Sequence, residues 1–367
     1  MTQTVHTLFR YLAFGIIAVV SLSLLGRLAD RSDASASGAR LRAVLFVNGT
    51  LGDKSFFDSA AAGMRQARLS LPVATRVVEG GTDPTRWQSA LADLADSGQV
   101  DLIVVGTFTM VAYVQTLAAQ FPHMRFIVFD AAVDYAHCTC ANVHSILFRQ
   151  NEGAYLAGYL AAMLLRQQAL PGVDPKAGLG VVGGMQFPVI EDYLVGFRAG
   201  ARAFDPDIVV ATQYANGFSD PAAGKDIANA QMAAGAALIF HAAGATGQGV
   251  NEAVSQAHRY SIGVDLDQYA LAYRSNPERA AAIVTSVMKN IDVAIVQALG
   301  QHLEGRLPWG RARSLGLAEG GVGLAPHSRV MQNAPAAIGA RLDAVRADII
   351  AGRIRIPGAL VPAGSAG

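Results

Sequence analysis

The sequence has little charge and none of the short motifs that mark common catalytic sites. Charged residues make up 16% of its 367 residues, and 29 basic against 28 acidic side chains leave a net charge of +1. This balance supplies no broad positive field, so we expect no nucleic-acid partner. The P-loop, G-x-S-x-G and H-E-x-x-H patterns are missing. An enzyme is therefore the less favoured class, and we expect no cofactor.

Cysteine occurs twice, in the segment His137-Cys138-Thr139-Cys140. Its C-x-C spacing differs from the C-x-x-C spacing usual at zinc sites, so we expect no metal site, although His144 lies nearby. A pair of thiols and a disulfide formed after export are the two remaining interpretations. Neither cysteine follows the N-terminal apolar run, which argues against a lipid-modified cysteine as a membrane anchor.

Residues 1–40 are typical of a targeting segment. One arginine and no acid occur in residues 1–10, and an apolar run follows over residues 11–25. Ala34-Ser35-Ala36 offers a signal-peptidase site, and an uncleaved membrane anchor is the alternative. Either interpretation places the remaining chain outside the cytoplasm. At the other end, we expect residues 358–367 to form a flexible tail.

Length and hydrophobic pattern predict two α/β lobes, because 367 residues exceed what one core usually supports. Short, continuously apolar runs alternate with longer helical stretches, and such runs are typical of strands buried on both faces of a parallel sheet. The expected strands are 42–47, 101–105, 125–129, 179–182, 208–213, 237–240 and 260–264, and the expected helices are 57–69, 111–120, 189–203, 222–234 and 247–256. The fold class is therefore α/β, with two doubly wound parallel sheets.

Ligands of such sheets lie beyond the carboxyl ends of the strands. There the sequence places polar, glycine-rich and aromatic segments: 48–56, Asp130, 183–185, 214–220, 243–247 and 265–268. Aromatic rings and carboxylates are thus expected at one cleft. The loop 48–52 lacks the third glycine of a dinucleotide cradle, which argues further against a Rossmann-like enzyme.

Several of these segments resemble the basic membrane protein family, whose members include purine-nucleoside receptors of ABC importers. The similar stretches include GDKSFFDSAAAGM (52–64), VVGGMQFPVIEDYLVGFRAG (181–200), GFSDPAAGKDIA (217–228), FHAAGATGQGV (240–250), GVDLDQ (263–268) and TSVMKNID (285–292). The resemblance extends from about residue 43 to about residue 324, in the same order and at compatible spacing. It implies a type I periplasmic-binding-protein fold with a multi-crossover hinge.

The resemblance also implies a function and an organisation. We expect a monomeric, extracytoplasmic binding protein that delivers a purine nucleoside to the permease of an ABC importer by closing its lobes. A ligand sensor that signals to a separate receptor is the alternative. Residues 41–147 with 270–310 would form one lobe, and residues 148–269 with 311–357 the other.

Carried over by position, the resemblance implies seven ligand-binding residues. Two aromatic rings would sandwich the base, an acid would bind the ribose, and a helical lysine would pair with that acid. The residues are Asn48, Phe56, Asp130, Phe218, Gly244, Asp265 and Lys289. From the residues alone, Asp265 would instead cap the following helix, and Lys289 would lie on a solvated helix face.

Asn48 and Phe57 depart from the family pattern, which generally has Asp and Asn at these positions. An amide both donates and accepts hydrogen bonds, whereas an ionised carboxylate only accepts. We therefore expect Asn48 to tolerate adenosine, and Asn48→Asp to shift the preference toward inosine and guanosine.

Overall fold

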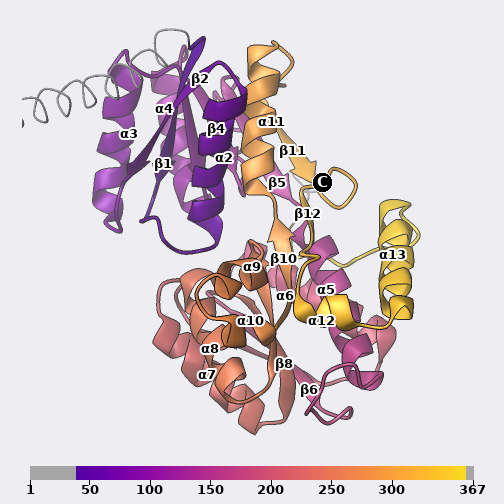
Figure 1. The fold of residues 1–367 in the computed structure, drawn as a ribbon. Coiled ribbons are helices and arrows are strands. Elements are labelled where there is room, and N and C mark those ends of the chain that lie inside the picture. Colours follow the sequence, from indigo (N-terminus) through magenta and orange to yellow (C-terminus); the bar gives the residue numbers. More distant parts are fainter. Residues whose placement is uncertain (1–38, 361–367) are drawn as a thin grey trace, which may run out of the picture.

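The computed structural model describes residues 39–360. The expected signal peptide or anchor lies outside the described residues, and so does the end of the tail. Within the described part, no helix is both long and apolar enough to cross a membrane. The described residues form two lobes, each built on a six-stranded sheet (Figure 1).

The sheet of the first lobe has the strand order β11-β5-β4-β3-β1-β2, and all of its paired strands are parallel. Its strands are β1 (Leu41–Val47), β2 (Val73–Glu79), β3 (Leu102–Gly106), β4 (Arg125–Phe129), β5 (Val143–Phe148) and β11 (Arg311–Leu315). Its helices are α2 (Phe56–Ser70), α3 (Trp87–Asp96), α4 (Val111–Gln120) and α11 (Ile291–Leu303).

The sheet of the second lobe has the order β12-β10-β9-β8-β6-β7, and only β12 runs antiparallel to its neighbour. Its strands are β6 (Gly178–Gly183), β7 (Val210–Tyr214), β8 (Ala236–Ala242), β9 (Tyr260–Asp265), β10 (Ile283–Lys289) and β12 (Val322–Leu324). Its helices are α5 (Gln150–Arg166), α6 (Pro188–Phe204), α7 (Pro221–Ala233), α8 (Gly247–Gln256), α9 (Gln268–Tyr273), α10 (Pro277–Ala281), α12 (Arg329–Asn333) and α13 (Ala336–Ile350).

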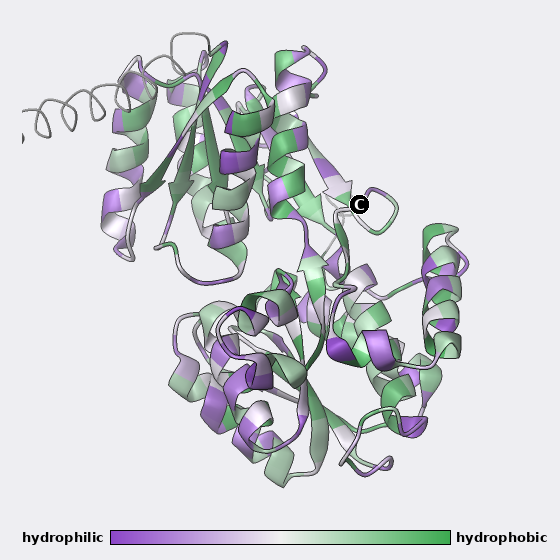
Figure 2. Ribbon diagram, in the orientation of Figure 1, coloured by the Kyte–Doolittle hydropathy of each residue, from purple (hydrophilic) through white to green (hydrophobic). Residues whose placement is uncertain are grey.

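Helices cover both faces of each sheet, as the continuously apolar strands require. In the first lobe, α2 and α11 pack together on one face, and α3 and α4 cover the other. In the second lobe, α5 and α6 cover one face, and α7 and α8 the other. The strands are predominantly hydrophobic along their length, whereas the helices mix both kinds of residue (Figure 2). The expected fold class is confirmed.

Helices α5 and α6 approach each other closely enough for backbones to touch. A side chain added at Gly158 would place its first carbon 1.9 Å from the carbonyl oxygen of Phe197, and one added at Gly200 would lie 1.9 Å from that of Tyr155. Both positions therefore require glycine for packing rather than for backbone conformation. This contact holds α5 and α6 close together, starting where the chain enters the second lobe after Arg149.

The chain crosses between the lobes three times, at Arg149, at Asn290 and over residues 316–321. The observed sheets differ from the expected boundaries in two segments. Residues 270–289 were expected in the first lobe, but α10 and β10 belong to the second. Residues 311–315 were expected in the second lobe, but β11 extends the first sheet beside β5. A short edge strand has few apolar residues to reveal its sheet.

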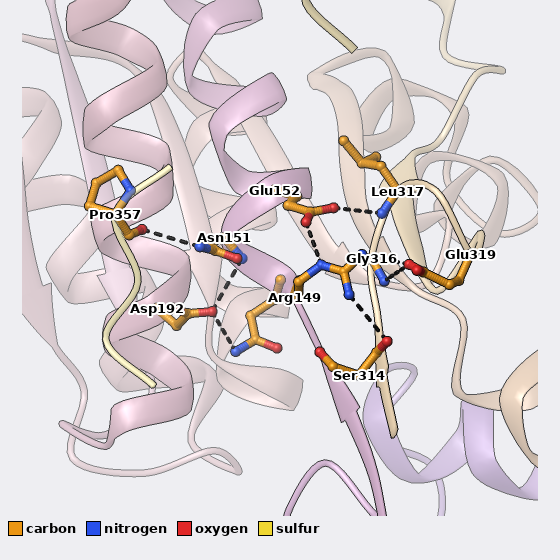
Figure 3. Close-up of polar contacts among 10 residues, drawn as sticks. Arg149, Asn151, Glu152, Asp192, Ser314, Gly316, Leu317, Glu319 and Pro357 are labelled. Atoms are coloured by element: carbon orange, nitrogen blue, oxygen red, sulfur yellow. Dashed lines mark hydrogen bonds and ion pairs between the residues drawn. The ribbon is translucent and has the colours of Figure 1, made fainter. Parts of the chain in front are cut away.

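The tail begins as a docked segment rather than a flexible one. The backbone N–H of Ala359 donates to Asp192 Oδ1 at 2.8 Å. Asn151 Nδ2 donates to the carbonyl oxygen of Pro357 at 3.2 Å (Figure 3). Residues 357–359 are thereby tied to the start of α5 and to α6. The expectation of flexibility from residue 358 is wrong for these residues.

Candidate functional site

Three of the expected residues lie at strand ends that face the other lobe. Asp130 follows β4, Asp265 ends β9 and Lys289 ends β10. Both aspartates adopt left-handed backbone conformations, with φ of 61° and 63°. Such conformations cost free energy in residues other than glycine and are often retained at functional sites. The strand ends therefore hold these carboxylates in place at the expense of backbone strain.

Lys289 and Asp130 form a buried ion pair across the lobes. Lys289 Nζ lies 2.6 Å from Asp130 Oδ1, and the two side chains are 2% and 8% exposed. The ammonium also lies 5.1 Å from the ring centre of Tyr193 and 5.7 Å from that of Phe148. Burial raises the pKa of Asp130, and the charge of Lys289 opposes that rise. Lys289 was expected on a helix, but it is the last residue of a strand.

Asp265 joins the lobes through a second buried contact. Ser55 Oγ, from the first lobe, donates to Asp265 Oδ2 at 2.5 Å, and the Tyr193 hydroxyl donates to Oδ1 at 3.4 Å. Burial raises the pKa of Asp265 to about 6, although Lys289 and the Ser55 hydroxyl favour the ionised form. The helix that follows is capped by Asp267, whose side chain accepts from the Ala270 N–H, so Asp265 is not the cap.

These five residues, Ser55, Asp130, Tyr193, Asp265 and Lys289, are called the cleft cluster below. It brings together three of the expected residues and adds two that were not expected. Gln268 supports it from the side, because its Nε2 donates to the carbonyl oxygen of Lys54 at 2.9 Å across the lobes. At this buried position the carboxylates can accept hydrogen bonds from the hydroxyl groups of a ligand, and the ammonium can donate hydrogen bonds to them.

The two expected aromatic residues belong to opposite lobes. Phe56 is the first residue of α2. The centre of its ring lies 5.3 Å from the ring centre of Phe129 and 5.9 Å from Lys289 Nζ. Phe218 lies in the loop before α7 and is 37% exposed. A side chain added at Gly184 would come within 2.3 Å of the Phe218 ring, so this glycine leaves room for it.

Gly244 packs against the backbone of Phe218. It has a φ of 55°, and an added side-chain carbon would lie 3.2 Å from the carbonyl oxygen of Phe218. The same carbonyl accepts from the Thr246 N–H at 3.1 Å, and Thr246 Oγ1 donates to the carbonyl oxygen of Gly217 at 3.1 Å. These bonds fix the loop that carries the exposed ring. Gly244 therefore lies directly against that loop.

Asn48 lies apart from the cleft cluster, at the end of β1. Its Nδ2 donates to Thr107 Oγ1 at 3.0 Å and to Thr109 Oγ1 at 2.9 Å, both in the segment between β3 and α4. Its Oδ1 is buried and has no hydrogen-bond partner among residues 39–360. Both amide hydrogens are therefore used within the protein. A hydrogen bond from this amide to adenosine would require a change in these contacts, and the expected tolerance of adenosine stays a prediction.

Beside Asn48, an aromatic contact crosses the mouth between the lobes. The ring centres of Phe108 and Phe187 lie 4.4 Å apart, and Phe108 is 46% exposed. Phe108 belongs to the first lobe, and Phe187 precedes α6 in the second. Sequence reasoning missed this pair and also missed Ser55, Tyr193 and the two threonines, because their partners lie far away along the chain.

Figure 3 shows a further polar cluster, at the hinge, which we call the hinge cluster: Arg149, Glu152, Ser314 and Glu319. Arg149 lies 2.5 Å from Glu152 Oε1 through Nε and 2.5 Å from Glu319 Oε2 through Nη2. It also donates to the carbonyl oxygen of Ser314 at 3.1 Å. One guanidinium thus links two of the three crossings between the lobes.

Cys138 and Cys140 are joined by a disulfide, which is one of the two interpretations left open by the sequence. Residues 39–360 contain no group of three or more side chains suited to holding a metal ion.

Comparison with known proteins gives a consistent result. Residues 40–359 match the family described as Bmp, ABC transporter substrate-binding protein PnrA-like. Basic membrane protein A of Borreliella burgdorferi is 30% identical over 291 residues, which cover 78% of this chain and 80% of that protein. A CD4+ T-cell-stimulating antigen of Listeria monocytogenes is 27% identical and covers 84% of this chain and 85% of its own.

Solved structures agree on the fold. An ABC transporter solute-binding protein of Aeropyrum pernix superposes with a TM-score of 0.75 at 26% identity, covering 87% of this chain and 93% of its own. These neighbours have the periplasmic-binding-protein fold, and members of the family are substrate-binding proteins rather than enzymes. The chain belongs to the Bmp family of PnrA-like substrate-binding proteins of ABC transporters.

Proposed function

We propose that this protein binds a purine nucleoside between its lobes, outside the cytoplasm, and delivers it as a monomer to the permease of an ABC importer. The main support is the placement of Asp265. Its carboxylate is buried at the junction of the lobes, held by Ser55 and Tyr193, where it can accept two hydroxyl hydrogen bonds from a ribose.

The aromatic residues suit the other half of such a ligand. Phe56 and Phe218 come from opposite lobes, and a purine offers two large faces for stacking. Removing an aromatic from such a stack costs roughly 1–3 kcal/mol per base. Asp130, Lys289 and Gly244 complete the proposed set, by hydrogen bonding to the sugar and by holding the Phe218 loop.

The first test is to identify the ligand. Residues 40–367, purified without refolding, would be studied by native mass spectrometry and by thermal shift with nucleosides, pentoses and amino acids. A nucleoside that raises the melting temperature by mass action supports the proposal. If only sugars or amino acids stabilise the protein, the nucleoside assignment is overturned. A D-arabinose-bound neighbour at 18% identity makes pentoses the natural comparison.

The second test concerns the two rings. We expect Phe56→Ala and Phe218→Ala each to weaken nucleoside binding by at least about tenfold, the equivalent of roughly 1.4 kcal/mol. Phe204→Ala is the matched control, because its ring packs on Tyr159 at the far end of α6. Calorimetry on folded variants would decide. Unchanged affinity in both cleft variants would assign these rings to packing alone.

A further inference from the structure

Gln268, the first residue of α9, holds a loop of the other lobe through its side-chain amide. Its Nε2 donates to the carbonyl oxygen of Lys54 at 2.9 Å across the lobes, and to that of Val264 at 3.2 Å within its own lobe. Its Oε1 accepts from Gln248 Nε2, on α8, at 2.7 Å. The residue is 2% exposed. Both amide hydrogens and the amide oxygen therefore have partners, and one of the three partners belongs to the first lobe.

These partners determine which end of the amide is which. Lys54 and Val264 present backbone carbonyl oxygens, which only accept hydrogen bonds, so the atom that faces them is the nitrogen. The oxygen at the other end of the Gln268 amide then needs a donor, and the Gln248 amide supplies one through its nitrogen. Gln248 and Gln268 thus form one directed chain of hydrogen bonds that ends at the Lys54 carbonyl. We call these two residues the amide bridge.

The second lobe leaves the Gln268 side chain little freedom. A side chain added at Gly263 would place its first carbon 2.4 Å from Gln268 Cγ, so this glycine leaves room for it. The backbone N–H of Gln268 donates to Ser286 Oγ, on β10, at 3.0 Å. These contacts lie within the second lobe, so separating the lobes would break only the bond to Lys54.

In the first lobe, the loop that meets the amide bridge also carries Phe56. Lys54 has a φ of 51°, and its N–H donates to Asp58 Oδ2 at 2.9 Å. The Gly52 N–H donates to the other oxygen of the same carboxylate at 2.8 Å. These bonds hold Lys54 in a conformation that is unfavourable for residues other than glycine, with its carbonyl oxygen bonded to the second lobe. Phe56 follows two residues later, so a bond at Lys54 also restrains the position of its ring.

At its other end the amide bridge reaches the support of the Phe218 loop. Gln248 is the second residue of α8 and follows Thr246 by two residues. The Thr246 N–H donates to the carbonyl oxygen of Phe218 at 3.1 Å, and Thr246 Oγ1 accepts from the Asp220 N–H at 2.9 Å. The amide bridge therefore connects the two segments whose rings are proposed to stack on the base.

We propose that Gln268 and Gln248 are positioning residues, which hold the Phe56 loop against the support of the Phe218 loop and thereby slow the release of the bound solute. This inference rests on the proposed function and deepens it. Gln268 acts directly, because its bond to Lys54 crosses the lobes, and Gln248 acts through Gln268. Since this bond must break before the lobes separate, its loss changes the release rate more than the association rate.

The experiment measures the association and release rates of inosine on the full-length protein by surface plasmon resonance. Gln268→Met keeps an unbranched side chain of similar size but removes the amide, so release should become about tenfold faster, with association within about twofold of wild type. Gln248→Met removes only the donor to Gln268 and should speed release about threefold. The double variant should release inosine no faster than Gln268→Met alone, because Gln248 reaches the first lobe through Gln268.

Gln256→Met is the matched control. Gln256 lies exposed on α8, and its amide donates to Glu252 on the same helix at 3.2 Å, so neither rate should change. Equal release rates for Gln268→Met and Gln256→Met overturn the inference. Slower association with unchanged release also overturns it, because Gln268 would then serve the folding of the second lobe. Additive effects in the double variant overturn the role of Gln248.

Folding and the proposed function are checked separately. Circular dichroism shows whether each variant folds, and if Gln268→Met does not, the release rate of Gln248→Met against Gln256→Met decides in its place. If no purine nucleoside binds the wild type, the proposed function is overturned instead. The solute that raises the melting temperature then replaces inosine in the same comparison of variants.

Discussion

The cleft cluster and the hinge cluster both join the lobes, but they pair their charges differently. In the cleft cluster one ammonium, that of Lys289, lies near two buried carboxylates, those of Asp130 and Asp265. Of these two, it forms an ion pair with Asp130 alone. In the hinge cluster one guanidinium, Arg149, bonds both carboxylates.

The other partners of these carboxylates also differ. Glu152 Oε2 accepts from the Leu317 N–H at 2.7 Å, and Glu319 Oε2 accepts from the Gly316 N–H at 2.8 Å. Asp265 has only hydroxyl partners, one of them at 3.4 Å. The carboxylates of the hinge cluster bond a cation and backbone N–H groups and serve as structure, whereas we propose that those of the cleft cluster also bind a ligand. Substitutions in the cleft cluster should therefore change ligand affinity most, and substitutions in the hinge cluster should change the unfolding free energy most.

The largest effect is expected at Asp265. Asp265→Asn removes a charge that we propose accepts two hydrogen bonds from the ligand, so nucleoside affinity should fall about 100-fold, since charge-assisted bonds contribute roughly 1.5–3 kcal/mol each. Calorimetry on the folded variant measures this. A loss below threefold would place the sugar elsewhere.

The same variant should be more stable without ligand at neutral pH. The pKa of Asp265 is raised to about 6 by burial, so the folded state holds this proton more tightly than the unfolded chain does. That stabilisation is complete below about pH 4 and is lost as the pH rises through about 6. This change in pKa corresponds to roughly 3 kcal/mol of unfolding free energy.

Urea unfolding of the ligand-free protein at about pH 4.5 and pH 7 tests this linkage. The difference in unfolding free energy between Asp265→Asn and wild type should grow with pH. Asp96→Asn, at an exposed position on α3, is the control for changing a carboxylate to an amide. Parallel pH curves for Asp265→Asn and wild type would show that this carboxyl does not titrate differently on folding.

At the hinge the opposite result is expected. Arg149→Ala leaves two partly buried carboxylates without their cation and should lower the unfolding free energy by about 2 kcal/mol, with the preference among ligands unchanged. Arg353→Ala is the matched control, because its ion pair with Asp348 is largely exposed and should contribute little. If Arg149→Ala lowered the unfolding free energy as little as Arg353→Ala does, the hinge cluster would not stabilise the fold.

The smallest effect is expected for the aromatic contact at the cleft mouth. The pair Phe108 and Phe187 stabilises the closed arrangement without belonging to the proposed ligand set. Each alanine variant should raise the rate of ligand release severalfold, and a double-mutant cycle should give a coupling of about 1 kcal/mol. Stopped-flow release measurements would detect it. Additive effects of the two substitutions would mean that the rings do not touch in solution.

Much of the architecture follows from local patterns in the sequence. The runs 125–129 and 111–120 form β4 and α4 with the expected bounds, because a short apolar run and a longer helical one differ clearly in length. Strand β2 was not expected, since its residues are only partly buried at a sheet edge and include Arg76 and Glu79. Lys289 was assigned to a helix because β10 and α11 are separated by a single residue.

The candidate site was predictable in part for a related reason. Carboxyl ends of parallel strands meet at one edge, which drew attention to Asp130 and Asp265. The partners of these residues depend on how the lobes meet. Ser55 lies 210 residues from Asp265 along the chain, and no local pattern connects them. The threonines that orient Asn48 are 59 and 61 residues away and carry no motif of their own.

The three crossings also bear on how the chain folds during synthesis. Helix α11 packs on α2, and β11 pairs with β5, yet both are made after most of the second lobe. A chain that emerges from its N-terminus onward therefore presents an unfinished first lobe, with the edge of β5 open, until about residue 315. An open edge strand is a template for association with other chains. The last strands of the two sheets, β11 and β12, are made almost together. A chain truncated before about residue 311 would therefore have two incomplete sheets rather than one complete lobe.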